Sequence, residues 1–177
     1  VVLAHCFIPS LGGIHSPMGT QIGVGRSYHR NPNLAGAEAV AQACEQAGLS
    51  PADPRPDFVM LFATVGYRQE MLLKAVRTAT HQAPLIGCSA AGIITMGEAD
   101  ESNFAVTVLV VKSDEMHFAH GLSTGIKASS LQTGESVGEA ITTATHTDAS
   151  TAQALFLFLE GLSPNFDEFM EGLRSRT

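Results

Sequence analysis

Residues 58–63 read Phe58-Val59-Met60-Leu61-Phe62-Ala63, a run that is apolar at every position. A half-buried strand would alternate apolar and polar residues, and this run has no polar position that could face water. Strands that are apolar on both faces lie inside sheets whose two faces are both covered. We therefore expect residues 58–63 to form a central strand.

The segments around this strand predict alternating helices and strands. A short strand over 21–25 precedes a helix that ends at Gly48 and carries its small apolar residues on one stripe. Residues 67–79 have the pattern of a helix lying on a sheet, and residues 85–88 follow as a third strand. This βαβαβ order predicts an α/β fold in which helices pack on a mixed sheet.

The second half of the chain predicts further strands and two more helices. Residues 104–111 are expected to pair with 115–120 as an antiparallel hairpin in the middle of the chain. Helices are expected over 131–146 and along the apolar stripe of Phe166, Phe169, Met170 and Leu173. Residues 93–95 predict a short strand. One mixed sheet is expected to contain the strands at 21–25, 58–63, 85–88, 104–111 and 154–159.

Composition and charge narrow the classes of function. The chain has 177 residues, 45% of them hydrophobic, which is enough for the core of one domain. Its net charge of −7 disfavours nucleic acid and anionic membranes as partners. Three cysteines without a CxxC pair favour a reducing cytoplasm over a disulfide framework. The apolar opening is too short for a membrane anchor. Because Met18 and the two residues after it directly precede the first patterned segment, residues 1–20 are expected to be an extension and 21–177 a single domain.

Two short motifs could carry chemistry. The segment Gly23-Val24-Gly25-Arg26-Ser27 invites comparison with a phosphate-binding loop, but Tyr28 stands where a dinucleotide fingerprint needs glycine. A tight turn after the strand is the alternative. Cys88 ends a predicted strand before small residues, as a nucleophile would. No base accompanies it in sequence, so we expect a buried, unreactive thiol without a histidine within reach.

Metal and cofactor chemistry is not expected. His117 and His120 are three residues apart on a predicted strand and therefore point to opposite faces. Glu98, Asp100 and Glu101 crowd one loop without the alternating ligands of a calcium loop. This loop is interpreted as a solvated acidic turn.

The chain resembles the FIST domain family, and specifically the first part of its amino-terminal module. The similarity covers about 21–176 and follows the family's order of segments. Its most specific element is the run from Ile86 to Gly92. The other matching segments are 22–27, the alanine-rich helix 35–47, 56–63, 104–106 and 161–163.

This resemblance implies a cytoplasmic sensory domain of signal transduction that binds a small ligand such as an amino acid. Family members are often joined to an output signalling domain. Two departures are visible: Ile93 stands where members often carry Glu, and the chain ends before the later part of the module and the carboxy-terminal FIST module. We therefore expect either a truncated domain or one completed by oligomerisation.

The resulting prediction is a noncatalytic domain with its pocket at the carboxyl ends of the first three strands. Arg26 is expected to meet an anionic group, with hydroxyl groups orienting the ligand and Ala90 setting its size. The full set of expected ligand-binding residues is Gly25, Arg26, Ser27, Thr64, Val65, Cys88, Ser89 and Ala90.

Two other functions remain open from sequence. One is a cysteine-dependent hydrolase or transferase using Cys88, and the other is a noncatalytic assembly module. A homodimer is also expected, because the apolar stripe of the last helix needs a surface to pack against.

Overall fold

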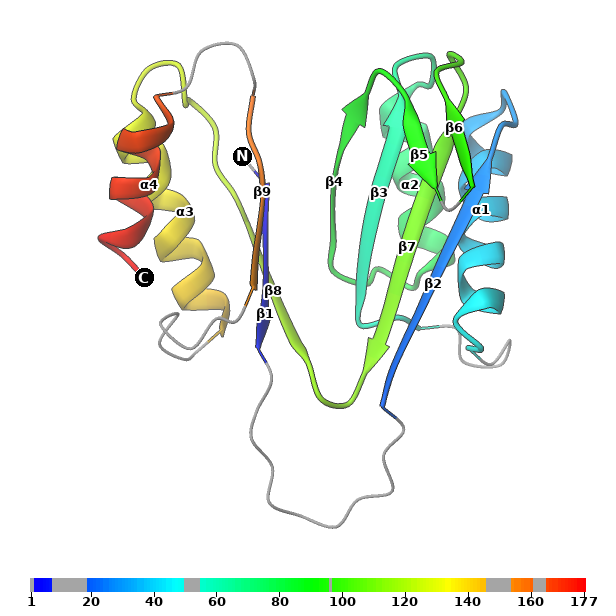
Figure 1. The fold of residues 1–177 in the computed structure, drawn as a ribbon, viewed down its shortest axis with the longest axis horizontal. Coiled ribbons are helices and arrows are strands. Elements are labelled where there is room, and N and C mark those ends of the chain that lie inside the picture. Colours follow the sequence, from blue (N-terminus) through cyan, green and yellow to red (C-terminus); the bar gives the residue numbers. More distant parts are fainter. Residues whose placement is uncertain (1, 8–18, 50–54, 96, 146–153, 161–164) are drawn as a thin grey trace. The chain divides into compact units, whose positions relative to one another are not determined.

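The structure is a computed structural model that describes residues 2–7, 19–49, 55–95, 97–145, 154–160 and 165–177. The chain divides into two compact units where the sequence predicts a single domain over 21–177. One unit comprises residues 14–115, and the other combines 1–13 with 116–177. Figure 1 labels the elements of both units, which are described separately below.

The unit of residues 14–115 contains a four-stranded sheet with the order β2-β7-β3-β4. Strand β7 (Val106–Ser113) is antiparallel to both of its neighbours, β2 (Thr20–Ser27) and β3 (Phe58–Thr64). Strand β4 (Leu85–Ala90) runs parallel to β3. The predicted mixed sheet is therefore confirmed, and β2, β3 and β4 all point the same way.

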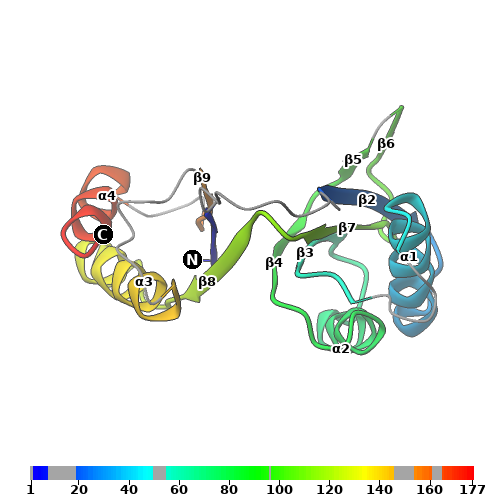
Figure 2. The same ribbon diagram turned by 90° about the horizontal axis from the view of Figure 1, so that it is seen from below.

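Helices α1 (Pro32–Gln46) and α2 (Gln69–Ala79) cover one face of this sheet (Figure 2). The side chain of Asn31 caps the start of α1 by accepting hydrogen bonds from the next turn. Helix α1 packs its buried alanines directly on β2. This contact leaves no room at Gly25, where an added Cβ would lie 1.9 Å from the Ala39 carbonyl oxygen.

Gly23 and Gly25 therefore do not have the expected role in a turn or a phosphate-binding loop, but allow α1 to approach β2. A Cβ at Gly23 would also lie 1.9 Å from a carbonyl oxygen of α1, that of Ala43. Both glycines lie within β2 and face the helix, so they form neither a turn nor a phosphate-binding loop. Their lack of side chains lets the helix backbone approach the strand.

No helix formed by the described residues of this unit covers the other face of the sheet. Side chains that point there include Met60 and Phe62 of β3, which are only half-buried, whereas Val59 and Leu61 are buried against the helices. The prediction that residues 58–63 are covered on both faces is thus correct for the helical face alone. The hairpin of β5 (Ile93–Thr95) and β6 (Glu98–Asp100) extends on this open side (Figure 2).

The second unit contains a three-stranded antiparallel sheet with the order β8-β1-β9. Its strands are β8 (His117–Leu122), β1 (Val2–Phe7) and β9 (Ala154–Phe158). Helices α3 (Ser130–Thr145) and α4 (Phe166–Arg174) pack against each other. Their shared core includes Ile126, Val137, Ile141, Phe169 and Leu173.

This arrangement corrects three expectations. The predicted hairpin between 104–111 and 115–120 is wrong, because β8 pairs with β1 in the other sheet. Strand β9 likewise belongs to the three-stranded sheet and not to the four-stranded one. Residues 2–7, which were expected to lie in an extension, form the middle strand of that sheet. Among the residues described, no helix is both long and apolar enough to cross a membrane.

Candidate ligand pocket

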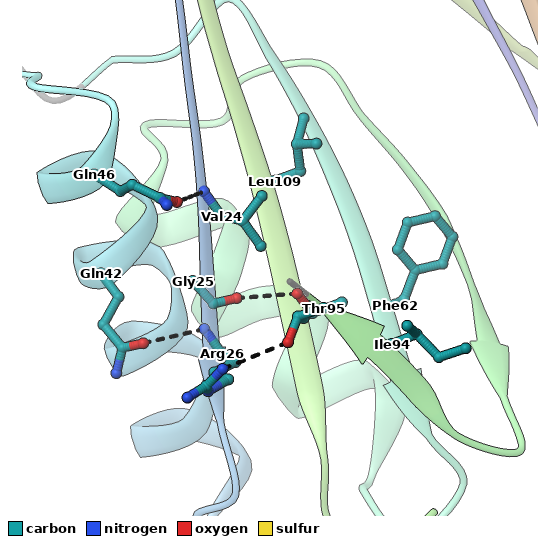
Figure 3. Close-up of a pocket in the computed structure, with 10 residues that line it drawn as sticks. Val24, Gly25, Arg26, Gln42, Gln46, Phe62, Ile94, Thr95 and Leu109 are labelled. Carbon is teal, nitrogen blue, oxygen red and sulfur yellow. Dashed lines mark hydrogen bonds between the residues drawn. The ribbon is translucent and has the colours of Figure 1, made fainter. Parts of the chain in front are cut away.

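A pocket of about 480 Å³ lies on the open face of the four-stranded sheet, next to the β5–β6 hairpin. Figure 3 shows side chains from β2, α1, β3, β5 and β7 around it. The pocket lies entirely within the unit of residues 14–115. Its lining residues are Val24, Gly25, Arg26, Gln42, Gln46, Phe62, Ile94, Thr95, Thr107 and Leu109.

Strand alternation builds the floor of the pocket in two rows. Val24 and Leu109 are register partners across β2 and β7 and form an apolar row. One step along, Thr107 lies between Arg26 of β2 and Phe62 of β3. Because successive side chains alternate between faces, both rows point away from the helices. The pocket therefore combines an apolar floor with one cationic side chain.

A polar cluster joins the hairpin to β2 at the edge of the pocket. The Arg26 Nη2 donates to Glu98 Oε1 at 2.9 Å, and its Nη1 donates to Thr95 Oγ1 at 3.5 Å. Glu98 also accepts a 2.9 Å hydrogen bond from the Tyr28 hydroxyl through its second oxygen. Below, these four residues are called the Glu98 cluster. A guanidinium carries more N–H donors than these two contacts use, so Arg26 can also receive a ligand.

The electrostatics of the Glu98 cluster keep Tyr28 protonated. Partial desolvation raises the pKa of the Tyr28 hydroxyl, and the hydrogen bond to the Glu98 carboxylate raises it further. The phenol therefore remains a hydrogen-bond donor throughout the neutral pH range. At the end of β6, hydrogen bonds from Ser102 lower the pKa of Asp100, which holds that carboxylate ionised.

Two glutamines of α1 reach the outer edge of β2. Gln46 Oε1 accepts a hydrogen bond from the Val24 N–H at 2.5 Å, and Gln42 Oε1 accepts one from the Arg26 N–H at 3.2 Å (Figure 3). Strand β2 ends the sheet on this side, so no strand of the described residues lies next to these N–H groups. The glutamines therefore fix the backbone that presents Arg26 to the pocket.

The structure brings only part of the predicted site together. Gly25 and Arg26 line the pocket. Ser27 is buried against α1, where its hydroxyl donates to Glu38. Thr64 is buried as well, and its hydroxyl both accepts from the N–H and donates to the carbonyl of Ala105. Val65 is exposed beyond the end of β3.

The predicted residues of β4 lie beside the pocket. Cys88 is the register partner of Phe62, while Ser89 is exposed and Ala90 is half-buried. The expectation that Cys88 is buried is wrong. Strand β4 is an edge strand of the sheet, and Cys88 is exposed on the face that the helices do not cover. Neighbouring atoms nevertheless desolvate the sulfur enough to raise the pKa of the Cys88 thiol. Within the described ranges, no cluster of three His, Cys, Asp or Glu side chains could hold a metal ion.

Sequence reasoning missed several residues of the pocket. Phe62 and Leu109 could have been found from strand alternation, once the open face was known. Glu98 was assigned to a solvated turn, whereas it begins β6 and pairs with Arg26. Nothing in the local sequence indicates that these two residues, far apart along the chain, meet.

We expect slow alkylation of Cys88 at neutral pH. Only the thiolate reacts, and the raised pKa leaves little thiolate at pH 7, so the rate should keep rising above pH 9. Iodoacetamide labelling with peptide mass mapping measures this rate, with the buried Cys44 as the internal comparison. Rapid labelling of Cys88 alone at pH 7 would contradict the expectation and favour a catalytic cysteine.

The family assignment rests on residues 57–115 of the sheet unit and on residues 116–177 of the other unit. A profile of the FIST N domain matches residues 57–177, which is more than half of the chain. The chain belongs to the FIST family. FIST domains are sensory domains of signal transduction, so the resemblance seen in the sequence is confirmed at this level. The pocket of this FIST domain uses β3, β5 and β7 from the matched range and β2 and α1 from the residues before it.

Comparison with solved structures finds matches of low similarity to parts of this chain. A substitution mutant of FtsZ from M. jannaschii is 19% identical over 54% of this chain, with a TM-score of 0.34. An empty FtsZ dimer from the same organism is also 19% identical, over 53%, with a TM-score of 0.33. The FIST chain spans only 28% and 26% of these two chains.

A third similar structure is an FtsZ-like protein of unknown function from Nostoc punctiforme. It is 18% identical over 58% of this chain and is itself covered completely, with a TM-score of 0.26. No curated protein matches the chain. At these scores the structural similarities carry no functional conclusion.

Proposed function

We propose that this FIST domain is a noncatalytic, cytoplasmic sensor whose pocket binds a small molecule with an anionic group, such as an amino acid. The observation that carries this proposal is the guanidinium of Arg26 at the edge of a largely apolar pocket. Small-molecule sites combine apolar walls with a few polar groups that orient the ligand. A guanidinium binds a carboxylate through paired hydrogen bonds.

The contacts of the pocket divide the ligand into two parts. The carboxylate would meet Arg26, with the hydroxyl groups of Thr95 and Thr107 close to it in the lining. The remainder of the ligand would pack against Phe62 and Leu109. We assign the orienting role to these two threonines because both line the pocket, where they bond to Arg26 and to the Gly25 carbonyl. The hydroxyl groups of Ser27 and Thr64 bond to protein atoms outside the lining. The predicted contacts through Ser89 and Ala90 stay predictions.

A thermal-shift screen of amino acids and small carboxylates tests the proposal. A ligand that binds only the folded protein raises the Tm by mass action. For any compound that does so, we expect Arg26→Gln to weaken binding about 10- to 100-fold, the loss expected for a hydrogen bond to a charged group.

The control for this screen is Arg77→Gln. Arg77 lies on α2, on the other face of the sheet, and bonds to Gln82. The Arg77→Gln substitution removes the same charge at a distance from the pocket, so ligand binding should not change. Equal affinities for the wild type and Arg26→Gln would contradict the proposed role of Arg26.

Two alternative functions keep specific support. The exposed position of Cys88 beside Phe62 leaves it accessible to a substrate, which supports the cysteine-dependent enzyme. Exposed apolar side chains such as Ile22 and Ile94 support an assembly module, including the expected homodimer. A screen in which no compound raises the Tm would favour the assembly module over the sensor.

A further inference from the structure

We propose that the Glu98 carboxylate is a built-in competitor for Arg26, occupying the guanidinium until an anionic ligand displaces it. This inference rests on the proposed function and adds to it the control of ligand entry. The sensor would then respond to compounds that bring their own negative charge. Neutral compounds of the same shape could not release Glu98.

The geometry shows that Glu98 already makes the contact expected of the ligand. Its carboxylate accepts from Arg26 Nη2 at 2.9 Å, a normal distance for a charged pair. The Arg26 side chain is 37% exposed and the Glu98 side chain is 48% exposed. Ion pairs in contact with water contribute little free energy, so an anion of suitable shape can replace Glu98.

The position of Glu98 couples this exchange to the hairpin. Glu98 begins β6 and is the register partner of Thr95 in β5. Arg26 contacts both of these residues, and Tyr28 directly after β2 bonds to Glu98. Among the described residues, these hydrogen bonds connect the hairpin to β2 and to the residue that follows it. A ligand that binds the Arg26 guanidinium in place of Glu98 breaks the ion pair between β2 and the hairpin. Binding at the pocket thereby changes the attachment of β5–β6.

Tyr28 provides a direct readout of the exchange. The chain has two tyrosines and no tryptophan. In a Tyr67→Phe background, Tyr28 is the only fluorophore that responds near 300 nm. A phenol hydrogen-bonded to a carboxylate fluoresces weakly. Glu98 bonds to Arg26 and to Tyr28 through its two oxygens, so we expect displacement of the whole carboxylate to release Tyr28 and to raise its emission. Because Tyr67 donates to the His29 carbonyl, the measurement is repeated with Tyr67 present, where Tyr28→Phe supplies the background.

The experiment uses the full chain and two matched probes, 4-methylpentanoate and the neutral 4-methylpentanamide. Glu98→Gln should raise Tyr28 emission without any probe. It should also bind the carboxylate about two- to fivefold more tightly than the wild type, because one exposed ion pair no longer competes. In the protein that retains Glu98, 4-methylpentanoate should raise Tyr28 emission toward the level of Glu98→Gln, and 4-methylpentanamide should leave it unchanged.

Glu101→Gln is the control variant. It neutralises another exposed carboxylate that follows β6 and should change neither emission nor affinity. Weaker carboxylate binding by Glu98→Gln would make Glu98 a ligand contact and overturn the inference while leaving the pocket in place. Unchanged emission in Glu98→Gln would also overturn it. Equal binding of the carboxylate by Arg26→Gln and the wild type would instead reject the proposed function.

Discussion

Gly25→Ala should destabilise the sheet unit by about 3 kcal/mol, the upper part of the range for overpacked cores. The added Cβ would lie 1.9 Å from the Ala39 carbonyl oxygen and 2.6 Å from the Ala43 nitrogen. Both atoms belong to the backbone of α1, so no side chain can rotate away to make room. Relief requires the whole helix to move off β2. Urea unfolding followed by circular dichroism measures the loss.

Gly19→Ala is the control for this substitution. It adds the same methyl group just before β2, where no atom lies within 4 Å. Its φ of +63° makes alanine cost about 1–2 kcal/mol through backbone strain alone. A similar loss for the two variants would show that the α1–β2 contact can adjust, contrary to this reading of the strand.

Phe169→Ala should remove about 3–5 kcal/mol from the stability of the other unit. Phe169 is fully buried between α3 and α4, in the same cluster as Val137 and Ile141. Its removal would leave a cavity that the closely packed helices cannot fill. Gly134 of α3 already lies so near to α4 that a Cβ there would be 2.1 Å from the Phe169 carbonyl oxygen.

Phe166→Ala provides a matched comparison on the same helix. Phe166 is 52% exposed, so the same truncation should cost less than about 1 kcal/mol. Thermal unfolding followed at 222 nm distinguishes the two variants. Comparable losses would show that Phe166 is covered in solution, as the predicted homodimer requires.

Local elements of the fold could be predicted from the sequence because their signals lie within a few residues. The alanine stripe of α1 and the apolar run of β3 both identify their elements correctly. Strand partners could not be predicted in the same way. The short Lys112-Ser113-Asp114 segment suggests a hairpin, yet β8 pairs with β1, more than a hundred residues away in sequence. Such pairing depends on packing across the whole chain.

The residues of the candidate site could likewise be predicted only where the signal is local in the sequence. Arg26 was identified because it comes near the end of a strand in a parallel set, where sheets present ligand-binding residues. Thr64 and Ser27 satisfy that rule equally well, but their hydroxyl groups face protein atoms. Ser27 is excluded because it alternates with Arg26 and faces α1, and Thr64 is excluded because its hydroxyl is bonded to Ala105.

The glutamines of α1 also affect how the sheet can grow. An unpaired strand edge is a template on which another chain can add, the first step toward fibres and swapped dimers. At β2 the amide oxygens of Gln42 and Gln46 stand in for the carbonyls of such a chain. Any strand added there must first displace them. Gln42 and Gln46 therefore oppose growth of the sheet by a foreign strand at β2.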